Sequence, residues 1–111
     1  MIEPNPGMDA EANTCLRFGV LLLSAGASGY RVIRAVKRCA RSVGFDEADV
    51  IVGFNTISCT FHRGLQFRTV VSDVPLPGVN ASRIEALETA AHSLLQSYRT
   101  PEVIDAVLDE I

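Results

Sequence analysis

The chain has 111 residues, of which 48% are apolar, and this is enough material for one hydrophobic core but not for two. Its formal net charge of -3 argues against a nucleic-acid-binding protein, because neutralising phosphates requires a surplus of Lys and Arg. The longest apolar run, residues 18–27, is interrupted by Ser24 and Gly26 and is much shorter than the roughly 20 residues that span a bilayer. We therefore predict one globular domain without a transmembrane segment.

The first 13 residues, with the sequence MIEPNPGMDAEAN, are acidic and rich in proline. A secretory signal would begin with basic residues ahead of an apolar stretch, and no basic residue precedes Leu16. We therefore predict a flexible leader over residues 1–13 and a folded domain over residues 14–111.

Three cysteines, Cys15, Cys39 and Cys59, are widely spaced along the chain. An odd number at such spacing is not a disulfide framework, and no Cys-x-x-Cys or Cys/His pair has the separation of metal ligands. Free cysteines usually pack as small hydrophobic side chains, and they persist in reducing compartments. The sequence thus predicts three buried free thiols, no metal site and a cytosolic location.

A first helix is predicted from Asp9, which can cap its first turn, to a stop at Gly26. Apolar residues recur at helical spacing and surround this helix almost completely: Leu16, Phe18, Val20, Leu21, Leu22 and Leu23. Such a helix is usually buried at the centre of a domain, and the alternative is a face left for a partner. Ser28 can cap the next helix, so residues 26–29 are predicted to form a corner between two helices.

The second predicted helix covers about residues 29–43 and has two contrasting faces. One face is apolar, with Val32, Val36, Cys39, Ala40 and Val43 at steps of three and four. The other carries half of the chain's Lys and Arg: Arg31, Arg34, Lys37, Arg38 and Arg41. Asp46, Glu47 and Asp49 follow and are expected to compensate part of this charge. The basic face is either a solvated helix surface or a contact for anionic lipid or another partner.

A β region follows the second helix. Residues 50–54 are rich in branched side chains, and residues 56–61 alternate, with Ile57, Cys59 and Phe61 on one side and threonines and a serine on the other. After a turn at Arg63-Gly64-Leu65, residues 66–74 are predicted to form the third strand of an antiparallel meander. Pro75 and Pro77 end the sheet, because proline cannot donate a ladder hydrogen bond.

The C-terminal part is predicted to be helical again. Asn80 or Ser82 caps a helix with one apolar stripe, made of Ile84, Leu87, Ala91, Leu94, Leu95 and Tyr98. Thr100-Pro101-Glu102 is a typical helix start, and the last helix has an apolar face of Val103, Ile104, Val107, Leu108 and Ile111. The predicted fold class is α+β: two N-terminal helices, a small three-stranded antiparallel meander and two C-terminal helices.

The segment Gly26-Ala27-Ser28-Gly29 invites a test as the nucleophile of a serine hydrolase. The nucleophile elbow G-x-S-x-G needs a glycine where Tyr30 stands and a strand before it, whereas the preceding segment is predicted to be helical. A serine nucleophile also needs a histidine base, and the chain offers His62 and His92. A helix-capping role explains Ser28 more simply, and the sequence contains no metal-binding or phosphate-binding motif either.

The run LRFGVLLLSAGASGYRV at residues 16–32, followed by a basic helix that closes at Val43-Gly44-Phe45, resembles the opening of the threonine/serine exporter family. Further segments are similar to this family in the same order: Thr56-Ile57-Ser58, Pro77-Gly78-Val79, Arg83-Ile84 with Leu87, and Thr100-Pro101-Glu102. The resemblance covers residues 14–111. It departs at Ile33 and Arg34, where many relatives carry acidic residues, so no role of such a carboxylate is expected here.

The resemblance implies a domain at the cytoplasmic face of the membrane that belongs to an exporter of small hydrophilic metabolites, threonine and serine or dicarboxylates. This domain would have an accessory or regulatory role, without enzymatic activity or a cofactor. Its expected partners are a transmembrane exporter bundle, in cis or as a separate subunit, further copies of the chain, and anionic lipid at Arg31, Arg34, Lys37, Arg38 and Arg41. A self-associating module and a small serine hydrolase are the alternatives. The candidate functional residues lie at the helix corner: Gly26, Ser28, Tyr30 and Arg31.

Overall fold

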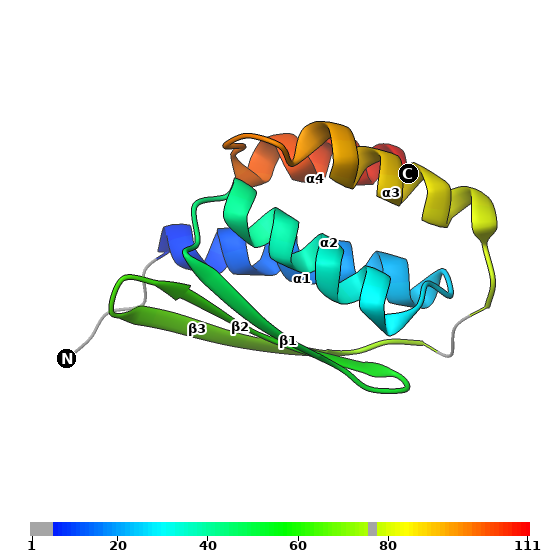
Figure 1. Cartoon of the computed structure of the whole chain (residues 1–111), viewed down its shortest axis with the longest axis horizontal. Helices are drawn as coiled ribbons and strands as arrows, with labels where there is room; N and C mark the ends of the chain where they lie inside the picture. The colour runs from blue at the N-terminus through cyan, green and yellow to red at the C-terminus, as the bar shows by residue number, and fades with distance from the viewer. Residues whose placement is uncertain (1–5, 76–77) are drawn as a thin grey trace.

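Residues 6–75 and 78–111, which the computed structural model describes, form four helices and a three-stranded antiparallel sheet (Figure 1). The elements in chain order are α1 (Pro6–Ser24), α2 (Gly29–Ser42), β1 (Glu47–Val52), β2 (Thr56–Arg63), β3 (Gln66–Asp73), α3 (Ala81–Leu94) and α4 (Pro101–Glu110). This order confirms the predicted α+β class. None of these helices is both long enough and apolar enough to cross a bilayer.

The elements are stacked in three layers, as Figure 1 shows. The sheet forms one outer layer, α1 and α2 lie across one of its faces, and α3 and α4 cover the far side of those two helices. Because α1 contacts α2, the sheet, α3 and α4, it needs apolar residues on nearly all sides. The predicted central burial of this helix is confirmed, and Phe18 and Leu22 are completely buried.

The start of α1 differs from the expectation. The helix begins at Pro6 rather than Asp9, and Met8 and Ala12 are 4% and 0% exposed. Both continue the buried stripe of Cys15 at steps of three or four, so the first two turns pack on the core instead of extending into solvent. Residues 6–13 of the predicted leader are thus part of helix α1, and residues 1–5 of that prediction lie outside the described part of the chain.

The three innermost elements meet at Gly19 of α1. A Cβ atom at this position would lie 2.6 Å from Cδ1 of Ile57 in β2 and 2.7 Å from Cγ2 of Val36 in α2. Side chains of a helix and a strand could not approach so closely if residue 19 had a side chain of its own. The glycine therefore sets the distance at which α1 packs against its two neighbours.

α1 and α2 end in the same way, each at a glycine in the left-handed conformation. Gly26 and Gly44 have φ angles of +93° and +98°. The N–H groups of Gly26 and Ala27 donate to the carbonyls of Leu23 and Leu22, and the residues after α2 repeat this pattern. These are Schellman motifs, which satisfy carbonyls that the helix itself leaves without partners. The predicted stop at Gly26 is thus confirmed.

Alternation of side chains along β2 sets the register of the sheet. Ile57, Cys59 and Phe61 are fully buried beneath the helices, as predicted. Cys59 lies opposite Val50 of β1 and opposite Val70 of β3, so the three strands share one buried face. β1 begins three residues before the predicted start, because Ala48 already points inward, and residues 53–55 form the connection to β2 instead of extending β1.

The prediction for Tyr98 is wrong. α3 ends at Leu94, so Tyr98 lies in the connection to α4 and is 67% exposed. This connection is held by the end of α2: the hydroxyl of Ser42 donates to the carbonyl of Ser97 at 2.8 Å, and the N–H of Arg99 donates to the carbonyl of Ser42 at 2.8 Å. The backbone groups that would have continued α3 are used in these tertiary hydrogen bonds.

α4 is held against α1 by polar contacts near the middle of α1. The hydroxyl of Thr14, which is 2% exposed, donates to Oδ2 of Asp105 at 3.0 Å. Arg17 pairs with Asp105 at 3.2 Å and also with Asp109. These contacts join residues about ninety positions apart and satisfy a hydroxyl that would otherwise be buried without a partner.

Candidate functional site

The helix corner around Ser28 is built by local hydrogen bonds. Oγ of Ser28 accepts a hydrogen bond from the N–H of Arg31 at 3.4 Å, which confirms its predicted role as the N-cap of α2. The corner also contacts the segment before α3: the N–H of Asn80 donates to the carbonyl of Ala25 at 2.9 Å. A Cβ atom on Gly26 would lie 2.6 Å from the carbonyl oxygen of Gly78, so the corner is closely packed on that side.

Neither histidine lies beside Ser28. Gly29 adjoins Val52, which pairs with Ile57, and His62 follows five residues farther along β2, about 17 Å away at the rise of a strand. His92 is in the last turn of α3, about 18 Å along the helix axis from the Asn80 cap that adjoins the corner. His62 instead contacts Asp49 at 3.1 Å on the exposed face of the sheet. The structure thus places no histidine base within reach of Ser28.

The other two residues predicted at the corner, Tyr30 and Arg31, face the clefts beside α2. Tyr30 is 73% exposed, and the guanidinium of Arg34 lies over its ring at 5.5 Å from the ring centre. Arg31 lines a cleft of about 360 Å³ between α2 and α3, together with Arg34, Ala81, Ile84, Glu85 and Glu88. The four predicted residues therefore divide into two that shape the corner, Gly26 and Ser28, and two that line a surface.

This cleft is internally paired. Nη2 of Arg34 lies 3.2 Å from Oε2 of Glu88, and Glu85 adds a second carboxylate. The other carboxylate oxygen of Glu88, Oε1, is buried and has no hydrogen-bond partner among the described residues. At this end of α2 the charges of both helices face one another.

The expected compensation of α2 by the acidic residues that follow it is not observed as ion pairs. Asp49 pairs with His62, and Oδ2 of Asp46 accepts a hydrogen bond from the N–H of Gly64 at 2.7 Å. Within residues 6–75 and 78–111, four cations of α2 have no ion-pair partner: Arg31, Lys37, Arg38 and Arg41. Asp46 and Glu47 share a cleft with Lys37 and Arg41 without forming an ion pair with them, and Asp49 lies on the outer face of the sheet beside His62.

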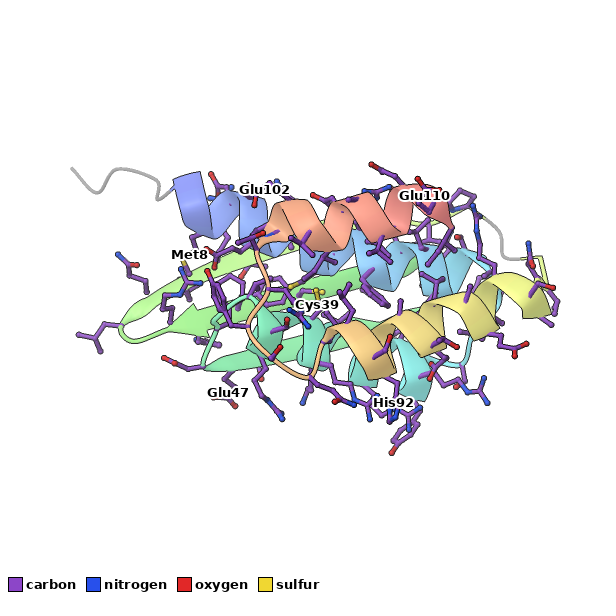
Figure 2. All side chains as sticks on the ribbon, turned by 90° about the horizontal axis from the view of Figure 1, so that it is seen from above. Met8, Cys39, Glu47, His92, Glu102 and Glu110 are labelled. Carbon is purple, nitrogen blue, oxygen red and sulfur yellow. The ribbon has the colours of Figure 1, made fainter. Side chains whose placement is uncertain are left out.

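A second cleft lies between the C-terminal halves of α2 and α3 and is different in character. It has a volume of about 440 Å³, and its lining is Arg38, Arg41, Ala91, His92, Leu95 and Gln96, with no carboxylate. Figure 2 shows His92 on the side of the molecule where α3 adjoins α2. This cluster was not predicted from the sequence: His92 and Gln96 are four residues apart, but α3 ends between them, at Leu94.

The outer face of the sheet is a further exposed surface, because no helix covers it (Figure 1). Ile51, Phe67 and Val71 project from the three strands' outer side and are 71%, 67% and 61% exposed. Phe54 and Leu65, in the two connections between strands, are exposed as well. Apolar side chains gathered on one face are typical of an interaction surface.

The three cysteines, remote in sequence, come together in the core, where α1, α2 and β2 meet; Figure 2 labels Cys39 there. All three are free and completely buried, as predicted. Burial raises the pKa of Cys15 well above its usual value and raises that of Cys59 to about 12. No group of three His, Cys, Asp or Glu residues within the described ranges is arranged to hold a metal ion.

Comparison with protein families gives one assignment. A family model described as "Putative threonine/serine exporter" matches residues 13–111, which is nearly the whole chain. No curated protein and no solved structure matches the chain. The matched range includes every strand and helix except the first part of α1. The chain therefore belongs to the threonine/serine exporter family.

Proposed function

We propose that this domain is an accessory or regulatory part of a membrane exporter of small hydrophilic metabolites and acts at the cytoplasmic face of the membrane. The observation that carries the proposal is the family match over residues 13–111. Threonine and serine are the substrates that the family's description suggests, and a dicarboxylate is the other class to be tested. The domain's part in transport would be gating, assembly or ligand sensing by contact with a transmembrane bundle.

The outer face of the sheet is the surface that this proposal assigns to the bundle. Ile51, Phe67 and Val71 are exposed there, with Thr60 and Thr69 hydrogen bonded to one another at 2.9 Å between them. Burying such side chains against a partner is favourable by about 25 cal/mol for each Å² of apolar surface removed from water. A flat face of this kind needs little rearrangement on binding, because β2 in its centre is already fully hydrogen bonded on both sides.

An efflux assay with a matched surface variant tests the proposal. The chain is co-expressed with the transmembrane segment of a threonine/serine exporter, in cells preloaded with labelled threonine, serine or a dicarboxylate. We expect the chain to change the efflux rate and to co-purify with the transmembrane segment, and the double variant F67T/V71T to lose both effects. The control is V103T, which alters an apolar residue on α4 that is 45% exposed. Unchanged efflux of all three substrates, together with no co-purification, would refute the proposal.

The same exposed side chains favour a second candidate function, a self-associating interaction module. In that case the partner of the sheet face is a second copy of the chain. Light scattering over a range of concentrations distinguishes the two: a dimer that F67T/V71T dissociates supports self-association, whereas a monomer at high concentration excludes it. The two functions are compatible if dimerisation accompanies assembly with the exporter.

A further inference from the structure

The cleft between the C-terminal halves of α2 and α3 gathers cationic and polar side chains and contains no carboxylate. Arg38 and Arg41 come from α2, His92 comes from the last turn of α3, and Gln96 lies just after that helix. Ala91 and Leu95, which are 2% and 7% exposed, form an apolar floor between the helices. Two guanidinium groups, an imidazole and a carboxamide therefore surround a cleft of about 440 Å³, a volume in the range of small-ligand sites.

At the N-terminal end of α2, the cleft between α2 and α3 instead contains both basic and acidic side chains. There Arg34 pairs with Glu88 at 3.2 Å, and Glu85 lies in the same cleft as Arg31. At the C-terminal end, Arg38 and Arg41 have no ion-pair partner among the described residues. Three positions apart on one helix, these two cations repel one another, which costs a few tenths of a kcal/mol.

The dipole of α2 compensates only part of the positive charge of Arg38 and Arg41. Arg41 lies in the last turn of α2 and interacts favourably with the negative end of that helix. A helix end carries the equivalent of roughly half an elementary charge, and the effect falls off within one turn. Arg41 also lines a neighbouring cleft with Asp46 and Glu47, although it forms no ion pair with either among the described residues. Arg38, about one turn earlier, is therefore the less compensated of the two.

We propose that this cleft binds a compact oxyanion, a phosphate or carboxylate group, between Arg38 and Arg41. Guanidinium groups bind such oxygens through paired, charge-assisted hydrogen bonds. His92 and Gln96 supply further donors from the opposite wall. The proposal rests on the cleft alone and holds whether or not the domain acts on an exporter.

The first test is a titration of the whole chain with inorganic phosphate, followed by NMR of the arginine side chains, the His92 ring and the Gln96 amide. We expect saturable shifts at these groups. The double variant R38Q/R41Q should weaken binding at least about tenfold for each guanidinium removed. The matched control is R31Q, which removes an unpaired cation from the cleft that Glu85 and Glu88 line, and for which we expect an affinity close to that of the unaltered chain. Unchanged thermal midpoints establish that each variant is folded.

A second arm distinguishes a free anion from a lipid headgroup. Vesicles of phosphatidylcholine, with and without phosphatidylglycerol, are sedimented with the chain and its variants. Binding that requires phosphatidylglycerol, Arg38 and Arg41, in the absence of shifts with phosphate, assigns the oxyanion to a lipid. Saturable shifts with phosphate assign it to a small molecule. The proposal is overturned if neither probe binds, or if R38Q/R41Q binds as well as R31Q.

Discussion

The charges around α1 and those on α2 are used in opposite ways. Around α1, charges of different elements are paired: Arg17 with Asp105 and Asp109 of α4, Glu11 with Arg63 of β2, and Asp9 with Arg68 of β3. On α2, one cation of five has such a partner within residues 6–75 and 78–111. Ion pairs thus hold α1 to its neighbouring elements, whereas most of the positive charge on α2 takes no part in holding the fold together. Charge that does not hold the fold is available for a ligand.

α1 and α2 nevertheless pack on the same hydrophobic core. We expect alkaline pH to lower the stability of this core more than any surface substitution would. The thiol of Cys59 has a pKa of about 12 in the folded chain, against a usual value of 9.0. Between these two values the unfolded state releases a proton that the folded state retains. The free energy of unfolding should therefore fall by about 1.4 kcal/mol per pH unit for this thiol, with full stability below pH 9.

Urea denaturation between pH 8 and pH 11 measures this effect against Cys59→Ala as the control. Tyrosines and other groups titrate in the same range, so the relevant quantity is the difference between the two pH profiles. The variant should start less stable and lose stability less steeply, with Cys15 responsible for part of the remaining slope. If the two plots of stability against pH are parallel, the pKa of the Cys59 thiol is not raised as its burial requires.

Gly19→Ala tests how closely α1 must pack against α2 and β2. The added methyl group would overlap Ile57 and Val36, so the helices or the strand must shift. We expect overpacking of the core to lower the free energy of unfolding by about 1–3 kcal/mol. The better helix propensity of alanine offsets about 1 kcal/mol of this loss. Thermal or urea unfolding measures the net change. An increase in stability would mean that the packing of α1 against α2 and β2 is looser than the geometry indicates.

The smallest effect bears most directly on the comparison. Arg17→Gln should destabilise the chain by about 0.5–1 kcal/mol, because it removes two partly exposed ion pairs that hold α4. Arg38→Gln should leave stability within about 0.5 kcal/mol, or raise it slightly by relieving repulsion with Arg41. Urea denaturation at low and moderate salt compares them. Equal losses of stability in the two variants would show that the paired charges around α1 and the unpaired charges on α2 contribute alike to the fold.

Features with local causes were predictable from the sequence. The corner at residues 26–29 needs only a glycine that tolerates positive φ and a serine that caps a helix, and both signals lie within four residues. The alternation of Ile57, Cys59 and Phe61 likewise identifies the buried side of β2 without knowledge of its neighbours. The family assignment from residues 14–111 agrees with the match over residues 13–111.

Features that depend on packing between distant segments were not predictable. His92 lies beside Arg41 only because α3 packs along α2, and the meeting of Cys15, Cys39 and Cys59 requires two helices and a strand to be in place. Met8 and Ala12 occupy an acidic, proline-rich segment, and its composition concealed that they continue a buried stripe. Composition describes what a segment contains, whereas burial depends on what it meets.

The contact between Thr14 and Asp105 has a consequence for synthesis. The partner of this buried hydroxyl is translated about ninety residues later, so the Thr14 hydroxyl can bond only to water until α4 has left the ribosome and docked. The sheet and α2 can form earlier, because their contacts are between neighbours in the chain. Docking of α4 is then the step that completes the domain during translation, and a nascent chain arrested before Asp105 would expose the apolar side of α1.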